Sequence, residues 1–266
     1  LQTVSQSIQA TLSGQLKEVD NISASIAELN IQIMNAKASG TEPSDLLDKR
    51  DQLLNKLSGY LPIQTQIDTS GALRIYSGSL RLVDGNISIP IPKEIDVANL
   101  SVSDGARSYP LTSGSLLGAL QSAKSANDNM AKLDQLANSL RTQVNSIHQT
   151  GSNGSTTGIS FFNDSNPQTG AINFDLSDEI KADPNNIMSG TTGAPGDGSL
   201  ALSLSKMRET GITTLGGRTF SDYYSDILST VGRDIASFSN SLDTAIAMVN
   251  QVDAQIQSVS GVNLDE

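Results

Sequence analysis

The sequence of 266 residues contains no cysteine, no tryptophan and a single histidine, His148. Disulfide frameworks, cysteine nucleophiles and structural zinc sites are therefore excluded. Aromatic residues make up only 4% of the chain, so aliphatic side chains must build the core. Long helices packed side by side fit that supply better than a ligand pocket walled by aromatic rings.

Basic residues and long apolar runs are also scarce. Seventeen basic residues stand against 28 acidic ones, which gives a net charge of -11. Such a surface would repel the phosphates of nucleic acid and of anionic membranes, so we expect neither as a partner. No segment reaches the roughly 18 consecutive apolar residues of a membrane span. The chain begins at Leu1 inside a patterned segment, and we expect it to be part of a longer protein.

Four segments carry the apolar spacing of long amphipathic helices. They are predicted at residues 1–38, 44–58, 115–148 and about 220–260, and in the first, third and last the apolar positions alternate three and four residues apart, as in coiled coils. Such seams form either the core of one chain or a contact between subunits. The predicted seam residues are Val19, Ile22, Ile26, Leu29 and Ile33 in the first helix and Ile235, Phe238, Leu242, Val249 and Ile256 in the last.

The last helix has the clearest pattern, and we expect its seam to be buried. Under that expectation, an aspartate in place of Val249 would unfold the bundle, because it would bury an unpaired charge.

Between residues 61 and 113 the apolar spacing shortens to two, which predicts short strands joined by tight turns. Pro90 and Pro92 cannot donate ladder hydrogen bonds, so their segment should lie at a sheet edge or leave the sheet. We therefore predict an α+β fold with an elongated helical bundle, a projecting β lobe and a loop-rich segment. The bundle is expected to combine residues 1–60, 114–150 and 220–266, with the lobe at 61–113 and the loops, holding short strands or helices, at 151–219.

Sequence motifs of catalysis, phosphate binding or metal binding are weak throughout the chain. No phosphate-binding loop, nucleophile elbow or zinc-protease motif occurs. His148 ends a helix beside a glycine-rich loop, where a contact with the helix end or a loop carbonyl explains it better than catalysis. Residues 164–170 depart from the pattern of a calcium-binding loop. The acidic residues at 175–183 indicate a solvated loop. We predict no catalytic, cofactor or metal site, and hence no enzyme.

Several motifs resemble the family of bacterial flagellar hook-associated protein 1, the hook–filament junction proteins. The specific match is the C-terminal string SGVNLDE, supported by the segment LLDKRDQLL and by two phenylalanines after a glycine-rich loop. The motif residues are Leu46, Leu47, Asp48, Arg50, Asp51, Phe161, Phe162, Ser260, Gly261, Val262, Asn263, Leu264, Asp265 and Glu266.

The resemblance implies a structural axial protein of the extracellular flagellum, secreted through the flagellar export channel. Its expected partners are copies of itself, the hook protein, the second hook–filament junction protein and an export chaperone. The resemblance also implies that the family's terminal helices are not part of this sequence. Two alternatives stay open: another axial export substrate, such as the second junction protein or a flagellin, or a surface adhesin or enzyme that uses the β lobe.

Overall fold

The computed structural model describes residues 2–164 and 170–260, except for the side chains of Asp253 and residues 256–260. The chain divides into two compact units, residues 1–128 and 129–266. The boundary falls inside the long helix α3 (Ser115–His148). No helix in the described part of the chain is long and apolar enough to cross a membrane.

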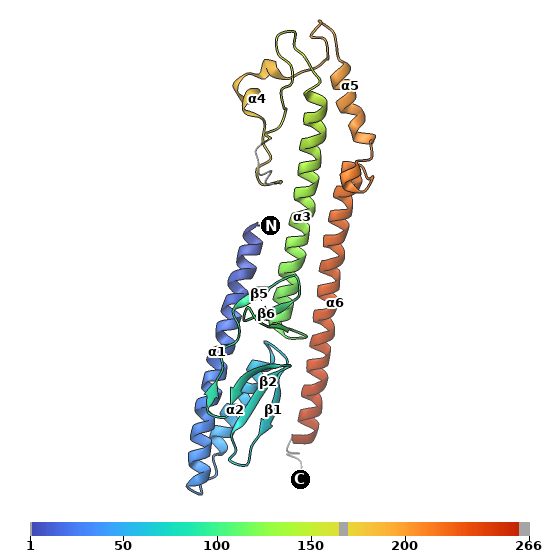
Figure 1. The fold of residues 1–266 in the computed structure, drawn as a ribbon. Coiled ribbons are helices and arrows are strands. Elements are labelled where there is room, and N and C mark those ends of the chain that lie inside the picture. The colour runs from blue at the N-terminus through green and yellow to red at the C-terminus, as the bar shows by residue number, and fades with distance from the viewer. Residues whose placement is uncertain (1, 165–169, 261–266) are drawn as a thin grey trace. The chain divides into compact units, whose positions relative to one another are not determined.

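The first unit opens with the predicted helical hairpin, α1 (Gln2–Ala38) and α2 (Ser44–Ser58). Gly40 ends α1 in the left-handed conformation (φ +77°), which glycine adopts without a steric penalty. Lys56 on α2 forms an ion pair with Glu18 on α1 at 2.5 Å, so the two helices lie alongside each other (Figure 1). The boundaries match the predicted segments because the glycine and proline stop signals act locally.

Seven short strands follow and form two antiparallel sheets. The first sheet has the order β1 (Gln64–Ile67), β2 (Leu73–Ser77), β3 (Leu80–Asp84) and β4 (Ile87–Ser88). The second has the order β5 (Glu94–Asp96), β6 (Ser101–Ser103) and β7 (Ser108–Pro110). Pro90 and Pro92 lie between the sheets and outside every strand, as their missing N–H groups predict.

The strands form the small antiparallel β lobe that the sequence predicts, and this lobe shares an apolar core with the helices. Buried residues of α1, α2, both sheets and the start of α3 form one apolar cluster. The backbone N–H groups of Ser115 and Leu116 at the start of α3 donate to the carbonyls of Gly59 and Tyr60, directly after α2. The two ends of the β segment are thus joined, and the strands share the helices' core. Its fully buried members include Leu16, Val19, Ile26, Leu57, Ile75, Leu82 and Leu116.

The second unit consists of the rest of α3, a loop-rich segment and the long helix α6 (Phe220–Ser260). The loops contain α4 (Asp178–Ala182), α5 (Ser199–Lys206) and three single turns of 3-10 helix at Pro184–Asn186, Met207–Glu209 and Thr213–Leu215. Helix α6 is joined to α3 near its start, where Tyr223 Oη donates to Gln135 Oε1 at 2.8 Å. A small apolar cluster lies at this junction, formed by Ile212, Leu215, Tyr223 and Ile227 with Leu133, Leu136 and Phe220 around it.

The predicted grouping of residues 1–60, 114–150 and 220–266 into one bundle stays a prediction, because α1 and α6 belong to different units. Within residues 151–219, the expected short elements are present as α4, α5, the 3-10 turns and isolated bridges, one of which pairs Phe162 with Leu176.

Candidate assembly interface

The two best-patterned helices use their apolar seams differently. On α1, Val19, Ile22 and Ile26 are at most 3% exposed and belong to the core of the first unit. Ile33 is also buried, and Leu29 is half-buried. These seam residues of α1 are therefore used mainly inside the first unit.

Helix α6 leaves its seam uncovered within the second unit. Four apolar positions seven residues apart are each more than half exposed, and Phe238 and Val252 are exposed as well. Ile256 lies outside the described side chains. The exposed fractions are 54% for Leu228, 64% for Ile235, 41% for Phe238, 60% for Leu242, 58% for Val249 and 52% for Val252.

These six residues are called the α6 stripe below. Val249 is 58% exposed, so no neighbour within the second unit buries it. The expectation that an aspartate there would unfold the bundle stays a prediction, and this exposure speaks against it. The heptad spacing predicts which side chains share a face, but it does not say what covers that face.

An exposed apolar stripe of this length is unusual on a soluble monomer, where apolar surface residues are normally scattered. The heptad spacing aligns the six side chains along one side of the helix, as in the seam of a coiled coil. Helix α6 has 41 residues, which corresponds to about 60 Å at 1.5 Å per residue. The geometry suits association with a long helix or another extended surface.

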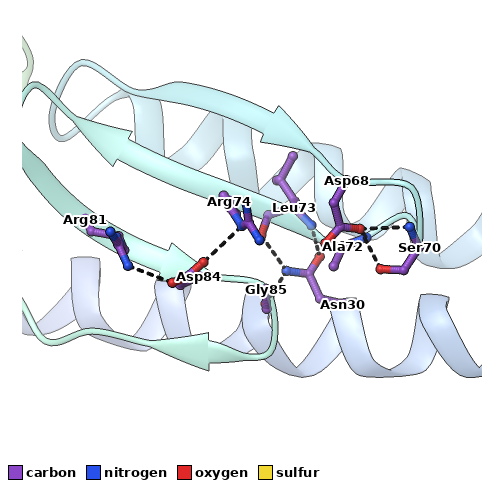
Figure 2. Close-up of polar contacts among 9 residues, drawn as sticks. All are labelled: Asn30, Asp68, Ser70, Ala72, Leu73, Arg74, Arg81, Asp84 and Gly85. Atoms are coloured by element: carbon purple, nitrogen blue, oxygen red, sulfur yellow. Dashed lines mark hydrogen bonds and ion pairs between the residues drawn. The ribbon is translucent and has the colours of Figure 1, made fainter.

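A buried polar cluster fixes the first sheet to the helical hairpin (Figure 2). Asn30 on α1 is fully buried, and its Nδ2 donates to the carbonyl oxygens of Leu73 (2.9 Å) and Gly85 (2.6 Å). Its Oδ1 accepts from the Leu73 N–H (3.2 Å) and from Arg50 Nη1 on α2 (3.2 Å). The Asn30 amide therefore pairs with Leu73 as a neighbouring strand would.

Arg50 completes this cluster. Its side chain is buried, and Nη1 also donates to the carbonyl of Gly71 at 3.0 Å, so both hydrogen bonds go to neutral oxygens. Burial lowers the pKa of the Arg50 guanidinium, and the charge of the neighbouring Asp51 offsets this only in part. Of the other motif residues on α2, Leu46 and Leu47 are half-buried, whereas Asp48 and Asp51 are exposed. Among the motif residues on α2, Arg50 is thus the one that ties this helix to α1 and to the loop before β2.

A second cluster holds the loops against the C-terminal half of α3. Phe161 and Phe162 are edge to face at 4.9 Å between ring centroids, and Phe162 lies 4.4 Å from Phe174. Asn145 on α3 clamps Phe162 by donating to its carbonyl (3.0 Å) and accepting from its N–H (2.8 Å). The buried Arg141 guanidinium lies over the Phe174 ring at 5.2 Å. The phenylalanines of the family motif therefore serve packing.

His148 has the structural role that its position predicts. The ring is fully buried, Nδ1 lies 2.7 Å from the carbonyl oxygen of Ile159, and Nε2 accepts from the Met188 N–H at 2.9 Å. Because a carbonyl can only accept, Nδ1 carries the proton in this arrangement. One side chain thereby ties α3 to two separate loops.

The acidic residues of the loops also have structural partners. Asp175 forms an ion pair with Lys181 at 2.6 Å, which lowers the pKa of its carboxyl, and Asp183 accepts from the Asn185 N–H. Asp197 accepts from the backbone N–H groups of Thr191, Thr192 and Ser199 and from the Thr192 hydroxyl. Hydrogen bonds from Thr192 and Ser199 hold the pKa of Asp197 far below its usual range.

No group of three or more histidine or acidic residues could hold a metal ion in the described ranges. The motif residues from Gly261 to Glu266 lie outside the described residues, as does the side chain of Ser260.

A family model described as the helical domain of flagellar hook-associated protein FlgK matches residues 1–162 of this chain. The chain belongs to the FlgK family. The match covers the whole first unit and all of α3, and it ends at the second phenylalanine of the motif. The α+β fold expected from the sequence is confirmed by the arrangement of long helices and small antiparallel sheets.

Among the relatives, flagellar hook-associated protein 1 of Bacillus subtilis is 26% identical over 314 residues, which cover 100% of this chain and 61% of that protein. Flagellar hook-associated protein 1 of Salmonella typhimurium is 26% identical over 159 residues, 54% of this chain and 29% of that protein. The solved structure of the flagellar hook junction protein FlgK from Burkholderia pseudomallei covers 60% of this chain and 32% of its own, with 27% identity and a TM-score of 0.48. The chain therefore spans less than two thirds of these relatives.

Proposed function

We propose that this chain is the body of a structural junction protein that connects the hook and the filament of the bacterial flagellum. Membership of the FlgK family supports the flagellar role, and the relatives are named as hook-associated proteins. The observation that carries the assembly role is the α6 stripe, an apolar surface with heptad spacing on a helix of 41 residues.

The proposed mechanism is association without chemistry. Copies join around the flagellar axis through extended surfaces, and each weak contact is reinforced by repetition in a closed assembly. The proposed partners are further copies, the hook protein and the second junction protein, with an export chaperone bound before secretion. The proposed location is the extracellular flagellum, reached through the flagellar export channel. We propose no enzymatic activity.

The test replaces Leu242 and Val249 together by aspartate in the full-length protein and introduces it into a strain that lacks its own junction protein. Both side chains are more than half exposed, so the protein should fold and be exported. Filaments should fail to remain attached, because charges on the α6 stripe oppose its burial. The matched control is Ser241→Asp with Asn250→Asp, two exposed polar positions of the same helix.

Attached filaments with the Leu242→Asp/Val249→Asp variant would contradict the role of the α6 stripe. Loss of attachment in the control as well would show that added negative charge, and not lost apolar contact, disturbs assembly, which also counts against the stripe. Failure of the unmodified protein to restore filaments would refute the junction function itself.

A further inference from the structure

One imidazole ring joins the end of α3 to two loop segments of the second unit. His148 is the last residue of α3 and the only histidine in the chain, and its side chain is fully buried. Nδ1 donates to the carbonyl oxygen of Ile159, and Nε2 accepts from the N–H of Met188. The arrangement therefore requires the neutral ring with its proton on Nδ1.

The segment around Met188 is packed tightly against this end of α3, and residues 187–190 are called the Met188 segment below. Met188 is 2% exposed, and a Cβ added at Gly151 would lie 2.4 Å from the Met188 Cβ, so the side chain lies directly on the Gly151 backbone. The Ser152 N–H donates to the carbonyl oxygen of Gly190 at 3.0 Å. If the bond to His148 is lost, the buried Met188 N–H can reach water only when the segment moves.

A second proton on the ring acts at Nε2 and not at Nδ1. The charged imidazolium donates from both nitrogens. The bond to Ile159 is kept, because its carbonyl oxygen still accepts from Nδ1. At Nε2, however, the new N–H would point at the N–H of Met188, whose nitrogen is 2.9 Å away. Two donors then oppose each other, so protonation acts selectively on the Met188 segment.

The segments that surround the ring supply no countercharge. Residues 142–163 and 184–196 contain no aspartate, glutamate, lysine or arginine. The hydrogen bonds of the ring go to backbone groups alone, and its ring contact is with Phe161, at 5.3 Å between centroids. The partial negative charge at the C-terminus of α3 favours the charged ring to a modest extent. The charged groups that border these segments are Arg141, Asp164, Asp183 and Asp197.

We propose that His148 is a proton-operated latch, which holds the Met188 segment on α3 when the ring is neutral and releases it when the ring gains a proton. Only the released segment leaves Nε2 free for that proton. Closure is therefore favoured above about pH 6.5, where an exposed histidine is neutral, and is lost as the pH falls below it. The inference is independent of the proposed function, because it concerns contacts inside the second unit.

A second clamp on α3 does not respond to protons in this range. Asn145 binds the N–H and the carbonyl oxygen of Phe162 through its amide, which does not titrate. Residues 159–162 should therefore stay on α3 when the Met188 segment leaves it.

Oxidation of methionine by hydrogen peroxide measures the release, because a buried thioether reacts only after it is exposed. The chain is treated at about pH 8 and at about pH 5, on either side of the histidine titration. Sulfoxide at Met188 is quantified by mass spectrometry relative to added N-acetylmethionine. Complete linkage would raise the open fraction about thirtyfold between these two conditions. Because the helix end favours the charged ring, we expect the relative rate at Met188 to rise about tenfold in acid.

Two variants assign the response to His148. In His148→Gln the side-chain amide oxygen can accept a hydrogen bond but does not titrate. The rate at Met188 should then be the same in both conditions, whether it is slow or fast. Asp197→Asn is the matched control, because it removes a titratable group from the loop that follows the Met188 segment. Since Asp197 titrates only at much lower pH, this variant should keep the rise in acid.

Nuclear magnetic resonance tests the selectivity. Labelling with 15N-histidine reports on one ring, because the chain has one histidine. It should show the proton on Nδ1 alone at about pH 8 and on both nitrogens at about pH 5. Amide exchange, expressed as protection factors that remove the intrinsic effect of pH, should show lost protection at the Met188 N–H and kept protection at the Phe162 N–H.

Four results would overturn the proposal. The first is an equal relative rate of Met188 oxidation in both conditions in the natural chain. The second is a rise in acid that persists in His148→Gln, and the third is a rise that disappears in Asp197→Asn, since either would assign the response to another group. The fourth is an equal loss of protection at Phe162 and Met188, which would indicate general unfolding of the second unit and no selective release.

Discussion

Replacing Asn30 by alanine should destabilise the first unit more than any exposed polar substitution on α1. The change removes four hydrogen bonds, two donated by Nδ2 and two accepted by Oδ1, of which three are buried and the one to Gly85 is partly buried. It also leaves the buried Arg50 with one neutral acceptor, the carbonyl of Gly71.

The expected size follows from these contacts. A buried hydrogen bond contributes about 1 kcal/mol net, and unsatisfied partners cost more. The four bonds share one side chain and are coupled, and alanine gains about 0.5 kcal/mol of helix propensity over asparagine. The free energy of unfolding should therefore fall by about 2–4 kcal/mol, a large part of the 5–15 kcal/mol typical of a domain.

Urea unfolding followed by circular dichroism measures this loss, and Asn35→Ala on the exposed side of α1 is the matched control. Amide hydrogen exchange adds a local readout, because the Leu73 N–H donates to Asn30. We expect that amide to lose protection in the variant beyond the loss of global stability. Equal stability of the Asn30→Ala and Asn35→Ala variants, with Leu73 still protected, would refute the role of Asn30.

Three further outcomes are expected. Gly114→Ala should prevent the first unit from folding stably. Gly114 has φ +89°, and a Cβ there would lie 2.3 Å from the carbonyl oxygen of Tyr60. Thermal unfolding measures the effect, and an unchanged melting temperature would contradict this close approach. His148→Phe should release the loops from α3, because it removes the hydrogen bonds to Ile159 and Met188. Limited proteolysis should then cleave within residues 151–190. Resistance to proteolysis equal to that of the natural chain would contradict the role of these two hydrogen bonds. Because the pKa of Asp197 is lowered in the folded state, its contribution to stability is present above the unfolded pKa of about 3.9 and is lost as the pH falls toward the folded value. Between about pH 5 and pH 2, the range of that titration, the free energy of unfolding of the second unit should therefore change less with pH in Asp197→Asn than in the natural chain. Equal slopes of this free energy against pH in the two proteins would contradict the prediction.

The sequence predicts the long helices well because their signals are local. The three-and-four spacing and the stop signals at Gly40, Gly59 and Gly151 define α1, α2 and α3 almost to the residue. The strands of the second sheet are harder to predict, because β5, β6 and β7 have only three residues each and too few positions for an alternating pattern.

The candidate site is predicted less completely. The seams of α1 and α6 have the same spacing, yet one is buried and the other exposed, since burial depends on neighbours that spacing does not encode. Asn30 follows Ile26 by one helical turn at a core position, but a lone polar residue there does not reveal its strand partner. The sequence singles out Arg50 only through the family motif, because a lone arginine on a helix does not reveal its partners Asn30 and Gly71.

The two seams can be compared directly by placing one aspartate in each and measuring helicity and melting temperature. Ile26→Asp should unfold the first unit, because it buries a charge without a partner at a cost of several kcal/mol. Val249→Asp should leave both helicity and melting temperature unchanged, because its side chain already faces solvent. Equal unfolding by both substitutions would contradict the claim that α6 keeps its apolar seam free for assembly.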